Sequence, residues 1–236
     1  TLWKGDIHLT VPMLFAIGFI FTFVHGGLTG LFLGNVTVDL PLSDTYFVVG
    51  HFHMVMGVSP ILVVFGAIYH WYPKITGRMW NERLGQIHFW MTFLGTYAIY
   101  LPMHYLGILG VPRRYYALGN TEFLPQSVHT INAAITIAAL VVAASVAIFL
   151  YNMIVSLWRG EKAPPNPWKA TTLEWLAASP PPHGNFVDMP VVYRGPYEYG
   201  TPGRKDDYWP QYLPGDAPTP GVGQGAAPQG AWAPAR

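Results

Sequence analysis

The sequence predicts an all-α fold: a polytopic bundle of transmembrane helices with about four spans, followed by an irregular Pro- and Gly-rich C-terminal tail. Hydrophobic residues make up 51% of the 236 residues, and charged residues only 11%. The apolar residues gather in runs long enough to cross a bilayer. The charged residues collect outside these runs. We therefore expect a transmembrane helical region over residues 1–162 and an extended tail over residues 163–236.

The first two spans are predicted at residues 12–33 and 46–72, joined by a turn at 35–45. The first contains HGGLTG at 25–30, whose glycines favour close approach of another backbone or of a flat ring. We expect the proline at position 60 to kink the second span, because proline removes a backbone donor.

Two histidines, His51 and His53, lie inside the second apolar run. Positions i and i+2 of a helix are about 200° apart and offset by about 3 Å along the axis. The two side chains should therefore face opposite sides and serve two separate centres. The alternative is that both are core histidines, but ionisable side chains inside a membrane are costly and usually functional. Gly50, directly before His51, leaves room for a bulky planar ligand or for a packed neighbouring helix.

The remaining spans are predicted at residues 87–109 and 128–157. The loop at 73–86 carries an excess of basic residues, which the positive-inside rule places on the cytoplasmic side. Pro102 should kink the third span, and we interpret its histidines, His88 and His104, as structural or interfacial.

The loop at 111–126 lies on the outer side by alternation, yet it contains the adjacent pair Arg113 and Arg114. Two guanidinium groups at this face need anionic partners, and their planar donor forks match carboxylates or phosphates. The alternatives are lipid headgroups and the carboxylates of a cofactor.

The tail has no apolar periodicity and is rich in Pro and Gly, so we expect an extended cytoplasmic segment that is ordered only where it lies on neighbouring protein. Aromatic residues such as Trp168, Trp175 and Tyr193 are candidates to hold its first part in place.

Composition also excludes several classes of function. The chain has no cysteine, which rules out disulfides, thiolate catalysis and iron–sulfur ligation within it. A net charge of +1 and the lack of a basic block give no indication of nucleic-acid binding. The sequence starts at Thr1 with no signal peptide before the first apolar run, and we expect it to be part of a longer chain.

Four motifs together resemble the C-terminal part of subunit I of the heme-copper oxidases, nearest to a bacterial cytochrome c oxidase. They are GGLTG at 26–30, SDTYFVVGHFH at 43–53, HYLGILGVPRRY at 104–115 and TTLEWLAASPPPHGNF at 171–186. The resemblance implies that His51 is the axial ligand of the high-spin, oxygen-binding heme and that His53 is a ligand of the low-spin heme. It further implies that Arg113 and Arg114 bind heme propionates.

The same resemblance matches Asp44 to an acidic residue that helps to hold a magnesium ion. The family has a histidine before this aspartate where the present chain has Ser43, so a usual ligand of that site is missing. The family's copper-binding histidines, the second axial histidine of the low-spin heme and the proton-channel entrances belong to earlier helices and have no counterpart here. Copper would therefore be bound outside this chain.

The function implied is that of a terminal oxidase in the inner membrane of a bacterium, which reduces O2 to water with electrons from cytochrome c and pumps protons. The cofactors would be two hemes, of heme A type, with copper and magnesium nearby. The partners would be the N-terminal portion of subunit I, subunits II and III, cytochrome c and membrane lipid. The alternatives are a quinol-driven oxidase, a non-catalytic di-heme electron-transfer module and a structural membrane subunit.

Overall fold

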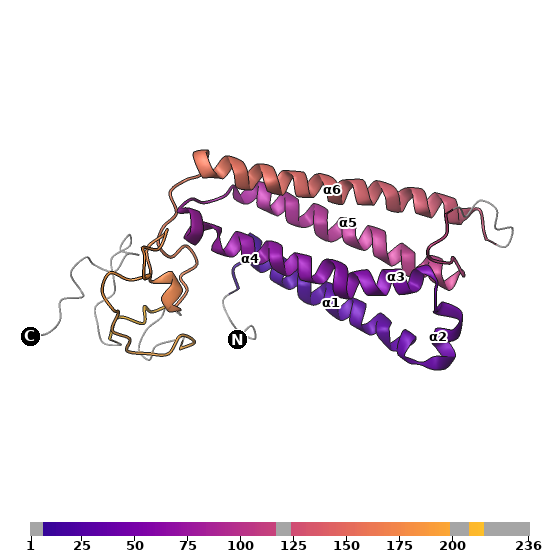
Figure 1. Cartoon of the computed structure of the whole chain (residues 1–236), viewed down its shortest axis with the longest axis horizontal. Helices are drawn as coiled ribbons and strands as arrows, with labels where there is room; N and C mark the ends of the chain where they lie inside the picture. The colour runs from indigo at the N-terminus through magenta and orange to yellow at the C-terminus, as the bar shows by residue number, and fades with distance from the viewer. Residues whose placement is uncertain (1–6, 117–123, 199–207, 215–236) are drawn as a thin grey trace, which may run out of the picture. The chain divides into compact units, whose positions relative to one another are not determined.

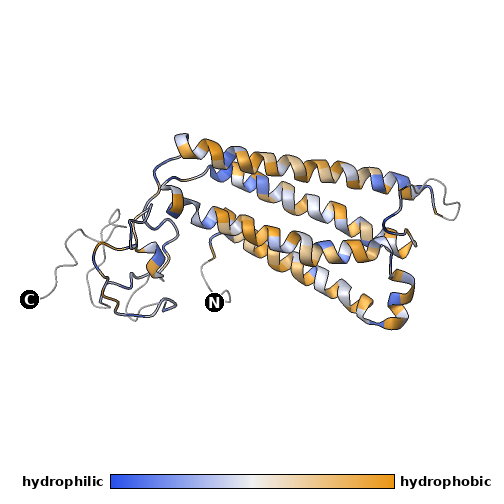
Figure 2. Cartoon of the chain, viewed as in Figure 1, coloured by the Kyte–Doolittle hydropathy of each residue, from blue (hydrophilic) through white to orange (hydrophobic). Residues whose placement is uncertain are grey.

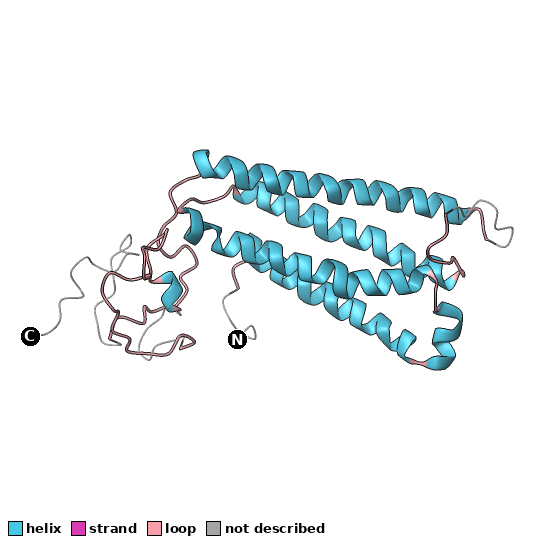
Figure 3. Ribbon diagram, in the orientation of Figure 1, coloured by secondary structure: helices cyan, strands magenta, loops and turns pink. Residues whose placement is uncertain are grey.

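The computed structural model describes residues 7–116, 124–198 and 208–214. These residues form helices joined by loops and contain no named β-strand, only the isolated bridges Thr45↔Pro112 and Arg78↔Lys162. Figure 3 shows this all-helical architecture. The predicted all-α class is confirmed. Residues 117–123, which belong to the loop predicted to lie on the outer side, and residues 199–207 and 215–236 of the tail lie outside the described residues.

The long helices are apolar along most of their length, as Figure 2 shows. Among the residues that the structure describes, three helical segments are long and apolar enough to cross a membrane: α1 (Val11–Gly34), the continuous run Tyr46–Thr76, and α6 (Ser127–Arg159). The helix α5 (Glu82–Ile108) has 27 residues and would extend about 40 Å. It carries more polar side chains, and its assignment as a further span stays a prediction.

The helices differ from the predicted spans mainly at their ends. The second predicted span stopped at residue 72, whereas α4 (Ser59–Thr76) continues through Pro73. The predicted loop at 73–86 is accordingly shorter, since α5 already begins at Glu82. Asn81 caps α5, because its side chain accepts a hydrogen bond from the Leu84 amide at 3.1 Å.

The segment at 35–45 was predicted to be a turn, and this prediction is wrong for most of its length. It contains the short helix α2 (Val36–Leu42). The Asn35 side chain accepts hydrogen bonds from the amides of Thr37 and Val38 at 3.1 and 3.4 Å. Asparagine in this capping position provides the start signal that the turn assignment overlooked.

The helix that contains both histidines changes its winding near the predicted kink. It runs as α3 (Tyr46–Phe52), then as the π-helix η1 (His53–Val58), and then as α4. Proline has no amide hydrogen, so Pro60 cannot bond the carbonyl one turn earlier. The wider π turn ends at Val58, two residues before the proline, and the Ser59 hydroxyl donates to the carbonyl of Met54 at 2.5 Å.

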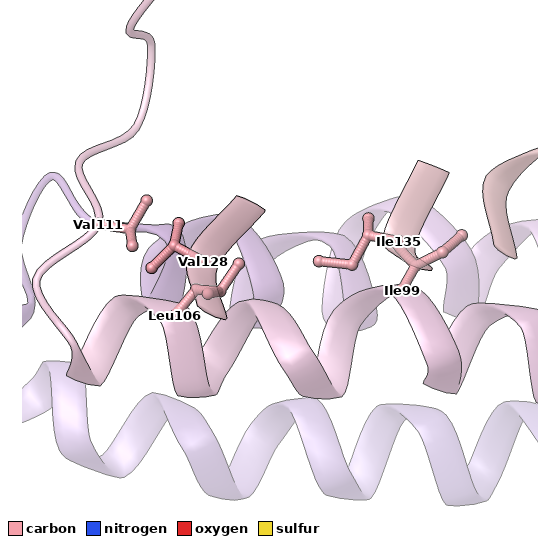
Figure 4. Close-up of a cluster of buried hydrophobic side chains, with 5 residues drawn as sticks. All are labelled: Ile99, Leu106, Val111, Val128 and Ile135. Carbon is pink, nitrogen blue, oxygen red and sulfur yellow. The ribbon is translucent and has the colours of Figure 1, made fainter. Parts of the chain in front are cut away.

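The chain divides into two compact units. The first contains Thr1–His70 and Asn81–Ile154, and the second contains Trp71–Trp80 and Val155–Arg236. In the first unit, α5 and α6 run side by side (Figure 1). Between them and the loop after α5 lies an apolar cluster, which Figure 4 shows, made of Ile99, Leu106, Val111, Val128 and Ile135.

A second cluster in the same unit is aromatic and draws on α1, α4, α5 and α6. The centroids of contacting rings lie 4.6–5.8 Å apart. The rings belong to Phe15, Phe65, Tyr69, His88 and Phe149. Close-packed rings of this kind contribute contact energy beyond their buried area. They fix the helices that carry the candidate site.

The second unit joins the end of α4 to the first part of the tail. Trp175, in the short helix η2 (Leu173–Trp175), is only 1% exposed. The Lys74 ammonium donates to the carbonyls of Ala177 and Pro165 at 2.6 and 3.1 Å, and it lies 5.0 Å from the Trp175 ring centroid. Trp175 therefore holds the tail as expected, whereas the Tyr193 side chain is 55% exposed.

Candidate functional site

The start of the histidine-bearing helix is joined to the loop that carries the paired arginines. Thr45 and Pro112 form an antiparallel bridge, the Tyr46 amide donates to the Val111 carbonyl at 2.9 Å, and the Arg113 amide donates to the Asp44 carbonyl at 2.8 Å. These bonds place the arginines beside the first turn of α3, although the two segments are far apart in the sequence.

His51 faces α1. Its Nδ1 atom lies 2.8 Å from the Gly26 carbonyl oxygen and 3.1 Å from the Thr29 hydroxyl oxygen. A methyl group at Gly30 would lie 2.8 Å from Cε1 of the His51 ring, so a glycine at this position is what lets the imidazole approach α1.

His53 faces α5. Its ring stacks on the ring of Tyr100, with centroids 5.1 Å apart and planes inclined by 12°. Its Nδ1 atom lies 2.9 Å from the carbonyl oxygen of Val49, one turn earlier in its own helix. The two histidines thus contact different helices, as their spacing predicted, while their roles as ligands stay predictions.

Both imidazoles have a backbone carbonyl oxygen within hydrogen-bond distance of Nδ1. A carbonyl oxygen can only accept, so the Nδ1 atoms of His51 and His53 must each carry the proton of these bonds. The Nε2 atom then keeps its lone pair. Metal-binding histidines in proteins typically donate their other ring nitrogen to a carbonyl or carboxylate in this way, which fixes the ring orientation and raises the basicity of the ligand. Both residues fit the role of axial ligand to a heme iron.

A groove of about 500 Å³ adjoins His53. Its volume lies within the range of about 300–1,000 Å³ usual for cofactor sites. Its walls are mostly apolar, and its polar side chains are one tyrosine, one histidine and two arginines. The lining residues are Tyr46, Val48, Val49, Phe52, His53, Met103, Arg113 and Arg114. A mostly apolar groove lined by one imidazole and two guanidinium groups suits an amphipathic macrocycle that carries carboxylates, so these residues fit a heme.

The two predicted anion-binding residues differ in their surroundings. The Arg113 guanidinium forms an ion pair with Asp44, with Nε 2.9 Å and a terminal nitrogen 2.5 Å from Oδ1. Within the described part of the chain, no ion pair involves Arg114, which lines the same groove. The structure therefore brings Asp44, Arg113 and Arg114 together, but the Asp44 carboxylate forms its ion pair with Arg113.

The residues at the predicted magnesium position do not fit a metal site formed by this chain alone. The Asp44 carboxylate is paired with Arg113, and the Ser43 hydroxyl donates to Asp39 Oδ2 at 2.9 Å. Among the described residues there is no group of three potential metal-ligating side chains. A divalent cation here would need ligands from outside the chain.

The two histidines of α5 are packed inside the protein, in line with their structural interpretation. His88 is fully buried, with Nδ1 3.1 Å from the Tyr69 hydroxyl, and His104 is 7% exposed, with Nδ1 2.7 Å from the Tyr100 carbonyl oxygen. A methyl group at Gly50 would lie 2.8 Å from the His104 ring. The small residue before His51 thus serves helix packing here and leaves no room for a planar ligand.

Sequence reasoning missed the residues that support the two candidate ligands, above all Thr29 and Tyr100. Each lies on a different helix from the histidine that it contacts, so local spacing carries no signal for the pairing. The only signal was a threonine within the glycine-rich motif at 25–30.

The fold and the site together define a helical membrane protein with two histidines on different faces of one helix. One of these histidines adjoins a mostly apolar groove that two arginines also line. Comparison with known families agrees with this class. Residues 1–141 match the family described as cytochrome c and quinol oxidase polypeptide I. The chain belongs to this family.

Curated relatives of the chain are named as cytochrome c oxidase subunits. The chain is 63% identical over 230 residues to the alternative cytochrome c oxidase subunit 1 of Bradyrhizobium diazoefficiens, covering 97% of this chain and 38% of the relative. It is 50% identical over 200 residues to cytochrome c oxidase subunit 1 of a Synechocystis species, covering 85% of this chain and 35% of the relative. The chain therefore spans little more than a third of these relatives.

A solved structure described as the cryo-EM structure of a heme-copper terminal oxidase dimer has a similar fold. The TM-score is 0.56 at 20% sequence identity, and the match covers 64% of this chain and 27% of the other. At this identity the likeness supports the helical arrangement only.

Proposed function

We propose that this chain is the C-terminal part of the catalytic subunit of a terminal respiratory oxidase. The complete enzyme reduces O2 to water with electrons from cytochrome c and couples this reaction to proton pumping. The observation that carries the proposal is the matched geometry of His51 and His53. Each presents Nε2 while its Nδ1 is hydrogen-bonded to a backbone carbonyl, and the two side chains lie against different helices.

In this proposal the chain supplies one axial histidine to each of two hemes, His51 to the high-spin heme and His53 to the low-spin heme. When bound, the hemes supply electron transfer and the binding of oxygen. The chain's own residues fix the positions of the two histidines. A single helical segment fixes the two ligands about 3 Å apart along its axis, which sets the relative position of the two centres.

The arginines complete the groove at His53. A guanidinium in a low-dielectric groove forms short, strong hydrogen bonds to carboxylates. Arg114, supported by Arg113, would hold the propionates at the outer end of the groove. The two guanidinium groups would bind the carboxylates of the cofactor, and the apolar lining of the groove would contact its ring.

The proposal includes the remaining components of the assembly. The hemes are of heme A type, and copper is bound by the N-terminal portion of subunit I, which is outside this chain. Subunits II and III, cytochrome c and membrane lipid are the further partners. Support for an oxidase comes from the family and from the names of the relatives. We do not include magnesium among the groups that this chain binds by itself.

We also propose that the protein lies in the inner membrane of a bacterium with its tail on the cytoplasmic side. The basic residues at the ends of α4 and α6 support this orientation. Arg78 and Lys162 belong to one antiparallel bridge, so these two basic residues lie on the same side of the membrane. Asp44 and Arg113 would then face outward.

The test is to express His51→Ala and His53→Ala separately in the complete oxidase and to record reduced and carbon-monoxide difference spectra. Loss of His53 should abolish the six-coordinate low-spin spectrum. Loss of His51 should abolish or strongly alter carbon monoxide binding while part of the low-spin spectrum remains. If both variants lose the same single heme, the two histidines share a centre and the proposal is wrong.

The family description names quinol oxidases as well, so a quinol-driven oxidase is the second candidate. Oxygen consumption by the purified complex with reduced cytochrome c or with a quinol as the sole donor separates the two. A di-heme electron-transfer module would retain both heme spectra, contain no copper and consume no oxygen with either donor.

A further inference from the structure

Three polar atoms form a closed triangle where α1 meets the histidine-bearing helix. The Thr29 hydroxyl donates to the Gly26 carbonyl oxygen at 2.7 Å. The Nδ1 atom of His51 lies 2.8 Å from the same carbonyl oxygen and 3.1 Å from the Thr29 hydroxyl oxygen. Two donors thus meet one acceptor, and the two donor side chains are also within hydrogen-bond distance of each other.

The positions of the protons follow from the capacity of each group. A threonine hydroxyl has a single proton, and Thr29 gives this proton to the Gly26 carbonyl. Toward His51 the hydroxyl oxygen can then only accept. The Nδ1–H of His51 is therefore shared between two acceptors, the Gly26 carbonyl oxygen and the Thr29 hydroxyl oxygen. This arrangement fixes the tautomer and leaves the Nε2 lone pair available.

We propose that Thr29 is a positioning residue that sets the orientation and basicity of the His51 imidazole, and through it the properties of the metal centre that His51 binds. The proposal rests on the proposed role of His51 as an axial heme ligand. Hydrogen-bond acceptors at the second ring nitrogen increase the electron density at the ligating one. Removing the Thr29 oxygen leaves the Gly26 carbonyl as the only acceptor, so Nε2 becomes a weaker donor to iron.

The test uses Thr29→Val, which removes the hydroxyl and nearly keeps the shape, and Thr29→Ser, which keeps the hydroxyl. Thr29→Ala is a second variant without the oxygen, in case valine disturbs assembly. In the reduced complete oxidase, valine and alanine should both shift the iron–histidine stretching band to lower frequency and raise the midpoint potential of the high-spin heme. The Thr29→Ser variant should have nearly the same stretching frequency and midpoint potential as the unmodified protein.

Thr136→Val is a matched control, because Thr136 makes the same kind of bond to the Asn132 carbonyl on α6, at 3.0 Å and at an exposed position. It should shift neither the band nor the potential. The proposal is overturned if the hydroxyl-free variants match the unmodified protein, or if Thr29→Ser shifts as far as Thr29→Val. An iron–histidine band that persists in His51→Ala instead contradicts the ligand role of His51, whatever the Thr29 variants show.

Discussion

Arg113 and Asp44 form an ion pair that joins the loop after α5 to the turn before α3, with the guanidinium Nε 2.9 Å from Oδ1. The pair is supported by the hydrogen bond from the Arg113 amide to the Asp44 carbonyl at 2.8 Å. The positive charge of Arg113 is thus already compensated within the chain. Arg114 lines the same groove without an ion pair among the described residues, and it is the better placed of the two for an external carboxylate.

We predict that Arg114→Gln lowers the midpoint potential of the low-spin heme more than Arg113→Gln does. Loss of a cation beside a propionate favours the oxidised heme, which carries the additional positive charge. A charge-assisted hydrogen bond contributes about 1.5–3 kcal/mol, which corresponds to roughly 65–130 mV at about 59 mV per tenfold change for a one-electron couple. Only the part of this energy that differs between the oxidised and the reduced heme shifts the potential, so the shift should be tens of millivolts. Redox titration of the low-spin absorbance band measures it.

The control is Asp44→Asn, which removes the partner of Arg113 and keeps both arginines. It should raise the low-spin potential slightly, since the Arg113 charge is then less compensated. Equal downward shifts in the two arginine variants would contradict the division of roles between them. Unchanged potentials in both would indicate lipid headgroups as their partners.

The sequence allowed the fold class and the two-faced placement of His51 and His53 to be predicted, because both follow from local composition and the helical period. The pairing of Arg113 with Asp44 was not predicted, since it depends on how two distant segments meet. The same holds for Thr29, which contacts His51 across a helix interface. The helix α2 was missed for a local reason, the capping Asn35, and the π-helix before Pro60 shows how a proline can alter winding ahead of itself.

Tyr100 provides a test of the His53 side of the site. We predict that Tyr100→Leu shifts and broadens the low-spin heme spectrum, because the imidazole loses the ring on which it stacks. Aromatic pairs contribute about 0.5–1.5 kcal/mol beyond their buried area, so the heme should remain bound. Tyr97→Leu, one turn earlier on α5 and beside His25, is the matched control. A spectral change of the same size in both variants would argue against a specific role of Tyr100.

Lys74 tests how the tail is held. We predict that Lys74→Met exposes the segment after residue 163 to proteolysis, because the carbonyls of Ala177 and Pro165 lose their donor and Trp175 loses the cation beside its ring. A buried group left without its partner costs about 1–3 kcal/mol. Limited chymotrypsin digestion followed by mass spectrometry locates the cuts. The exposed Lys162→Met variant removes the same charge and should resist digestion as the unmodified protein does.

The proposed orientation predicts which segments a protease can reach in sealed right-side-out vesicles. The tail should remain intact until the vesicles are lysed, because the basic ends of α4 and α6 favour the cytoplasmic side. The tail contains the exposed Lys169 as a trypsin target, so its survival would reflect protection by the membrane. Cleavage of the tail before lysis would reverse the orientation. Release of the tail on lysis serves as the internal control.

The glycine beside His51 gives a steric test that is independent of charge. We predict that Gly30→Ala displaces the His51 imidazole and weakens or abolishes carbon monoxide binding at the high-spin heme, because the new methyl group would lie 2.8 Å from Cε1 of the ring. Gly34→Ala, one turn further along α1, is the matched control, since a methyl group there meets no atom within 4 Å. Alanine raises helix propensity by about 1 kcal/mol inside a helix and by less at Gly34, the last residue of α1, so neither change weakens the helix, and loss of carbon monoxide binding in Gly30→Ala alone reports on the histidine. Carbon-monoxide difference spectra of the two complete oxidases make the comparison. Normal carbon monoxide binding in Gly30→Ala would mean that the close packing of His51 against α1 is not needed for its function.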